Sequence, residues 1–175
     1  MLSFANLKSK IGNRKSKITR GGFSLIEVLI AILLVGLAIV SLVAANSAFT
    51  KANGAGVDLS TAEFLIEQIR ELTAQLSVVD PQSTTATFGP EEAGLAGYDD
   101  LDDFDGANFS PPISSDRVAL NAFAGFRQRI TVENVSPSNF EQVVADHSSP
   151  FVRVTVKIFL NSKEISSASW IRARY

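Results

Sequence analysis

Residues near the start of the chain suggest a site for peptide-bond cleavage: Gly21, Gly22 and Phe23. Glu27 lies just beyond them. A glycine directly before Phe23 leaves the backbone open to a peptidase, because glycine has no side chain to displace. Glu27 places one carboxylate inside an apolar segment, where a charge is costly and usually serves a function. The pattern predicts a processing site between Gly22 and Phe23 and a functional role for Glu27.

A run of acidic residues forms a second group of candidates. Five aspartates occupy seven positions: Asp99, Asp100, Asp102, Asp103 and Asp105. Because these carboxylates repel each other, we expect the segment to be exposed unless a cation binds. An EF-hand calcium loop needs acids at alternate positions before its glycine, and Leu101 takes the first of these when Gly106 is aligned. We therefore prefer a solvated loop anchored by Tyr98 and Phe104, with a weak cation-binding loop as the alternative.

An apolar segment begins at the junction. From Phe23 to about Ala45 the only charged residue is Glu27, and this length is enough to cross about 30 Å of hydrocarbon as a helix. Residues 1–22 hold six basic residues and no acid, so the positive-inside rule predicts a cytoplasmic amino end. The cut would come before the apolar segment, so the anchor would remain after processing.

Charge and composition exclude several classes of function. Residues 23–175 carry ten basic and eighteen acidic residues, and an acidic body argues against binding to nucleic acid. The chain has no cysteine, which removes disulfides and thiolate metal sites. The only histidine, His147, stands beside serines in a polar stretch, where a solvated residue is the simpler interpretation than a member of a catalytic triad. We expect neither an enzyme nor a cofactor.

The junction resembles the class III signal of type IV prepilins and pseudopilins. The match runs through Lys17-Ile18-Thr19-Arg20-Gly21-Gly22 and continues with Phe23-Ser24-Leu25-Ile26-Glu27-Val28-Leu29-Ile30-Ala31. The resemblance implies that a prepilin peptidase cuts after Gly22 and methylates the new amine of Phe23. It also implies that Glu27, the fifth residue of the mature chain, acts in assembly with other pilin subunits.

Helical spacing continues past the anchor. The apolar residues on one face are Ala62, Leu65, Ile66, Ile69, Leu72 and Leu76. No proline interrupts residues 23–79, so we favour one helix, with 23–45 as the transmembrane segment or filament core and 46–79 as an amphipathic part. The alternative is a break at residues 53–57 and a new helix that starts at Ser60, which forms a capping-box pattern with Glu63.

Period-two alternation predicts antiparallel strands in the last third of the chain. The strands are expected at residues 126–135, 151–160 and 165–175, and the last two are joined by a hairpin turn at 161–163. Residues 118–123 form either a fourth strand or a short helix. The expected fold class is α+β and type IV pilin-like. A long N-terminal hydrophobic helix packs on a small antiparallel β-sheet in a head of residues 80–175, which begins with a linker.

The second half also resembles minor pilins of the mannose-sensitive haemagglutinin pilus group. The similar segments are the acidic run, the strand Val152-Arg153-Val154-Thr155-Val156 and the ending Arg172-Ala173-Arg174-Tyr175. The resemblance implies a minor pilin in the bacterial inner membrane, with a periplasmic head, and later in a pilus. The implied partners are the prepilin peptidase, other pilin subunits, the inner-membrane assembly machinery and lipid. The alternatives are a type II secretion pseudopilin and a single-pass protein with an independent binding head.

Overall fold

A computed structural model describes residues 21–79 and 87–174. The chain divides into two compact units, residues 1–48 and residues 49–175. Apart from Gly21 and Gly22, the predicted leader lies outside the described residues, as do residues 80–86 of the predicted linker and Tyr175.

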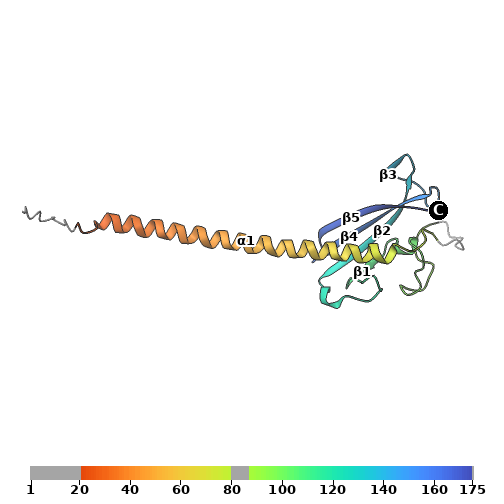
Figure 1. Ribbon diagram of the computed structural model, residues 1–175, viewed down its shortest axis with the longest axis horizontal. Helices are drawn as coiled ribbons and strands as arrows, with labels where there is room; N and C mark the ends of the chain where they lie inside the picture. The colour runs from red at the N-terminus through yellow and green to blue at the C-terminus, as the bar shows by residue number, and fades with distance from the viewer. Residues whose placement is uncertain (1–20, 80–86, 175) are drawn as a thin grey trace, which may run out of the picture. The chain divides into compact units, whose positions relative to one another are not determined.

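Helix α1 runs from Leu25 to Thr73 and has 49 residues (Figure 1). It starts after Ser24, whose hydroxyl accepts a hydrogen bond from the backbone N–H of Glu27 at 3.2 Å. The prediction of one helix rather than two is confirmed. Thr61 Oγ1 donates to the carbonyl of Val57 at 2.9 Å, one regular turn earlier. The helix is therefore continuous at residues 53–57, where the alternative prediction placed a break.

The helix ends at Thr73, and the prediction that it continues to residue 79 is wrong. The carbonyls of Thr73 and of residues just beyond it accept hydrogen bonds from the head. Arg172 donates to the carbonyl of Thr73 at 2.7 Å and to that of Leu76 at 2.9 Å. The backbone N–H of Leu101 then donates to the carbonyl of Ser77 at 2.9 Å. These tertiary bonds outweigh the helical pattern of the local sequence.

The head contains one antiparallel sheet. Its strands are β1 (Asn108–Phe109), β2 (Phe126–Ser136), β3 (Asn139–Val143), β4 (Phe151–Leu160) and β5 (Lys163–Ala173). The order is β1-β2-β4-β5, and β3 pairs with the end of β2. Asn161 and Ser162 have φ of 49° and 70°, as a tight hairpin turn between β4 and β5 requires. The three predicted strands are confirmed, but β5 begins at Lys163, which was predicted to lie in the turn, and ends at Ala173. β1 and β3 had no predicted counterpart.

Two short 3₁₀ helices complete the head. Residues 118–123 were predicted to form either a strand or a short helix. Their second half is helical, as η2 (Asn121–Phe123). Their first half forms only an isolated bridge between Ala119 and Ile113. The other, η1 (Asp102–Phe104), lies in the acidic run.

The core of the head lies between the end of α1 and the sheet. On the helix the buried apolar residues are Ala62, Leu65, Ile66, Ile69 and Leu72, and on the sheet they are Ile130, Val132, Val152, Val154, Val156 and Ile158. The predicted fold class, a long apolar helix packed on a small antiparallel sheet, is therefore confirmed. It is an α+β arrangement consistent with a pilin-like fold.

A buried glutamine joins the layers of this core. Gln128 on β2 donates to the carbonyl of Leu65 on α1 at 2.9 Å. It also accepts from the backbone N–H of Ile113 at 2.7 Å and donates to the carbonyl of the same residue at 3.1 Å. A buried amide is stable only when its polar atoms are paired, so Gln128 fixes the helix and the loop at 113 to the sheet.

Candidate functional site

Gly22 and Phe23 lie outside regular secondary structure, directly before α1. The side chain of Phe23 is 80% exposed. A Cβ added at Gly22 would meet no atom within 4 Å. The chain itself therefore sets no requirement for glycine at this position. If glycine is needed, the need comes from a molecule that approaches the backbone.

Glu27 lies in the first turn of α1. Its N–H is the one capped by the Ser24 hydroxyl, and the carbonyl of Ser24 accepts from the N–H of Val28 at 3.2 Å. Ser24 and Glu27 thus occupy the positions of an N-cap and its third helical residue, where glutamate favours helix initiation. Sequence reasoning missed this role of Ser24, although the spacing of a serine and a glutamate three residues later was the signal for it.

The part of α1 within residues 25–48 is exposed along its whole length. Its exposed side chains include Leu25, Ile32, Leu37, Val40 and Leu42, each more than half exposed. Within residues 21–79 and 87–174, α1 is the one helix long and apolar enough to span a membrane. An apolar surface of this size is stable only when lipid or another protein covers it.

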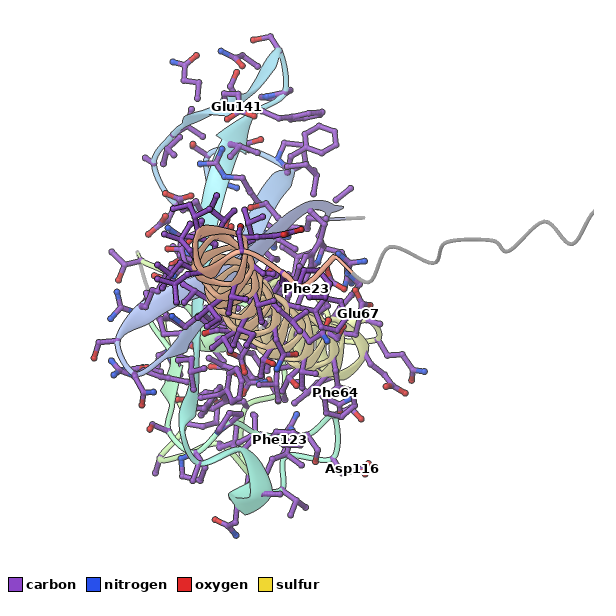
Figure 2. All side chains as sticks on the ribbon, turned by 90° about the vertical axis from the view of Figure 1, so that its left-hand side faces the viewer. Phe23, Phe64, Glu67, Asp116, Phe123 and Glu141 are labelled. Atoms are coloured by element: carbon purple, nitrogen blue, oxygen red, sulfur yellow. The ribbon has the colours of Figure 1, made fainter. Side chains whose placement is uncertain are left out.

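A shallow apolar groove lies on α1 within the head unit. Phe64 of α1 and Phe123 of η2 form one wall, with ring centroids 5.9 Å apart, and their side chains lie near each other in Figure 2. The floor consists of small residues of the helix, including Ala52 and Gly56. The groove would accept a ridge of apolar side chains.

The acidic run is not the solvated loop that the sequence favoured. Asp100, Asp102 and Asp103 are each 1% exposed. The predicted anchors are confirmed: Phe104 is fully buried, and its ring meets that of Tyr98 edge-on at 5.1 Å. Burial of the neighbouring apolar residues brings the aspartates inside despite their mutual repulsion.

The other two aspartates of the run have different positions. Asp99 is exposed. Asp105 turns toward the sheet, where its Oδ1 accepts from the backbone N–H of Val132 at 2.8 Å. The five predicted residues therefore do not act as one group.

The buried aspartates are only partly hydrogen-bonded. Asp103 Oδ2 accepts from the backbone N–H groups of Asp99 at 2.9 Å and Asp100 at 3.4 Å. Asp100 Oδ1 accepts from the N–H of Asp103 at 3.2 Å. The remaining oxygens, which are Asp100 Oδ2, Asp103 Oδ1 and both oxygens of Asp102, are buried with no hydrogen-bond partner.

Two glutamates that sequence reasoning missed complete the cluster. The carboxylates of Glu91, Asp102 and Asp103 have oxygens within 4.8 Å of one another, and so do those of Glu92, Asp99 and Asp103. The pair Glu91-Glu92 lies just before the acidic run in sequence, and this proximity was the available signal. Asp103 belongs to both groups. The arrangement could hold a cation by oxygen ligands.

Burial makes the charged forms of these acids unfavourable. Burial is the largest of the causes that together raise the pKa of Asp102 to about 9, and the neighbouring Asp100, Glu91 and Asp103 supply the rest. Burial likewise raises the pKa of Asp103 to about 7, helped by the side chain of Glu92. Without a counter-charge, these groups hold protons that ordinary aspartates release.

Comparison with known proteins gave no relative. No family model matches the chain, and no match was found among curated proteins or among solved structures. The resemblance to prepilins therefore depends on the junction residues and is consistent with the fold.

Proposed function

We propose that the chain is a minor type IV pilin, a structural subunit of a pilus that a prepilin peptidase processes after Gly22. The observation that carries the proposal is the contrast between the two parts of α1. Residues 25–48 are exposed and mostly apolar, whereas one face of α1 between Ala62 and Thr73 is buried on the head. A helix divided in this way suits a subunit that is held by its first half and displays a folded head.

The exposed half fits both environments that the proposed function requires. Burying one leucine or isoleucine side chain contributes about 1.5 to 3 kcal/mol, so this segment strongly favours an apolar surrounding. Lipid and a bundle of neighbouring helices are alike in polarity. The subunit could therefore be held in the inner membrane and then enter a filament core without exposing residues 25–48 to water.

The junction supports processing before assembly. Cleavage after Gly22 would leave Phe23 as a new amino terminus just ahead of the helix. We propose that the positive amine of Phe23 on one subunit pairs with Glu27 of a neighbour. Such a pair would satisfy two charges where water is scarce. The peptidase, the other subunits, the inner-membrane machinery and lipid are the partners of this proposal.

The glycine at the junction offers a direct test of processing. A Gly22→Trp variant should remain uncleaved, because the peptidase must approach the backbone closely. The neighbouring Gly21→Ala is the matched control and should be cleaved. Both chains are expressed in a type IV piliated bacterium, and the membrane fraction is examined by mass spectrometry. Normal cleavage of Gly22→Trp, or a mature chain that starts elsewhere than at Phe23, would contradict the proposal.

Fractionation separates the alternatives. A pilin is expected in sheared surface filaments. Retention in the envelope together with loss of protein secretion on deletion would indicate a type II secretion pseudopilin instead. A chain that is neither cleaved nor assembled, with a head that binds a ligand by itself, would indicate a single-pass binding protein.

A further inference from the structure

We propose that the buried acidic loop of the head is a calcium site in which Glu91, Asp102 and Asp103 bind the ion, with Glu92 beside them. This inference is independent of the pilin assignment, because it concerns only contacts within the head. It replaces the solvated loop that the sequence alone favoured.

The spacing of the oxygens suits the ion. Calcium binds six to eight oxygens at about 2.3 to 2.6 Å, so ligands on opposite sides lie about 5 Å apart. One carboxylate oxygen from each of Glu91, Asp102 and Asp103 lies within 4.8 Å of the other two. The second group, with Glu92 and Asp99, shares Asp103 and extends the same oxygen-lined space.

The bonding state of Asp102 is a second, independent observation. Its side chain is 1% exposed, and neither of its oxygens has a hydrogen-bond partner. Buried polar atoms in folded proteins are almost always paired, because an unpaired one loses its hydration without compensation. A proton shared between Asp102 and Asp100 and another between Asp103 and Glu92 would pair four of the unpartnered oxygens, but would leave the second oxygen of Asp102 unpaired. A divalent cation would satisfy several of them at once.

The positive side chain of Arg117 bonds to backbone beside this loop, and within the described residues no hydrogen bond from it to Asp100, Asp102 or Asp103 is found. Arg117 closes the other side of the loop, where its guanidinium donates to the backbone carbonyls of Leu95 at 3.0 Å, Ala96 at 3.2 Å and Tyr98 at 2.6 Å. It therefore shapes the segment before the aspartates. None of the ion pairs found in the described parts of the chain involves Asp100, Asp102 or Asp103.

The ligand type selects calcium among common cations. The group consists of carboxylates from a loop, a set that suits hard ions and lacks the imidazole and thiolate ligands typical of zinc. Magnesium demands near-ideal octahedral geometry and keeps several of its waters. A crowded set of carboxylates, with Asp102 and Asp103 buried and Glu91 exposed, favours the larger and more adaptable calcium ion.

Binding would fix the loop to the core of the head. Leu101 and Phe104, on either side of the ligands, are fully buried, and Asp100 forms a parallel bridge with Ser77 just after α1. Calcium would thus hold η1 against the end of the helix. Metal that binds only the folded state raises its stability.

The test uses the full chain in detergent micelles, freed of metal with EDTA and then exchanged into chelator-free buffer. Calcium chloride is titrated by calorimetry, and thermal melts are recorded with calcium, magnesium or EDTA. We expect saturable calcium binding and a melting temperature at least about 5 °C higher at saturating calcium than in EDTA. Identical melting temperatures in calcium and EDTA, without binding heat, would overturn the proposal. An equal response to magnesium would overturn the assignment to calcium.

Variants locate the site. Asp102→Asn keeps the shape of the side chain and should weaken calcium binding at least tenfold, while it raises the melting temperature in EDTA by removing a buried acid. Asp116→Asn, an exposed aspartate in another loop of the head, is the matched control and should bind as the parent does. Binding by Asp102→Asn with the affinity of the control would overturn the placement of the ion.

Discussion

Glu27 has two physical roles open to it, and one substitution separates them. As the third residue of α1 it can support the cap made by Ser24, and as a charge in an apolar segment it can pair with the Phe23 amine of a neighbouring subunit. Glutamine is as good as glutamate in a capping box but has no charge. The two roles therefore predict opposite outcomes for Glu27→Gln.

If Glu27 pairs with an amine, Glu27→Gln should accumulate in the inner membrane as cleaved subunit and be depleted from sheared filaments. Ser24→Ala is the matched control, since it removes the cap at a cost of about 1 kcal/mol but keeps the charge. It should reach filaments normally. Immunoblots of the two fractions at equal total protein provide the measurement. Normal filament levels of Glu27→Gln would leave capping as the sufficient role.

The buried acids make the metal-free head sensitive to pH. The pKa of Asp102 is raised from 3.8 to about 9 on folding, so the folded state holds its proton more tightly than the unfolded state. The stability that the Asp102 proton contributes to the folded state is fully present below pH 3.8 and is lost as the pH rises through about 9. In EDTA, denaturant midpoints should therefore fall between pH 5 and pH 9, and less steeply for Asp102→Asn. Midpoints that rise over this window would contradict the raised pKa.

At the scale of the elements, periodic burial made most of the fold predictable. Strands β2, β4 and β5 each alternate more buried and less buried residues, and α1 repeats apolar residues at helical spacing. The sequence therefore indicates which face of each element packs on the core. β3 is exposed along its length. It therefore carries no alternation that a sequence could reveal, and β1 is too short to show any.

The acidic loop was mispredicted because local charge and distant packing act in opposite directions. Repulsion among neighbouring aspartates favours exposure, but burial of Leu101 and Phe104 carries Asp102 and Asp103 inward. Glu91 and Glu92 lie beside Asp102 and Asp103 because of the path of the loop. The local sequence pattern does not predict that path. The end of α1 at Thr73 depends in the same way on Arg172, which lies far along the sequence.

The buried face of α1 supplies the element-scale prediction. Leu65 is fully buried between the helix and the sheet, whereas Leu59 on the same helix is 43% exposed. Leu65→Ala should lower the free energy of unfolding by about 2 to 5 kcal/mol. Leu59→Ala is the control and should change it by less than about 1 kcal/mol. Urea denaturation provides the measurement, and equal effects of the two substitutions would contradict the packing described.

For the whole molecule, the head should fold without the anchor. The buried core residues all lie within the unit of residues 49–175. A fragment of residues 49–175 is therefore expected to be monomeric and to melt cooperatively, as followed by circular dichroism. A fragment that melts without a cooperative transition would show that the head needs the first half of α1.

Assembly of the whole molecule into a filament can be tested directly on the filaments themselves. Surface filaments are sheared from cells that produce the chain, purified, and examined by mass spectrometry of the amino-terminal peptide. We predict a peptide that starts at a methylated Phe23, and its loss from filaments in the Gly22→Trp variant. Absence of the chain from the filaments, with residues 1–22 still attached in the membrane fraction, would contradict the assignment.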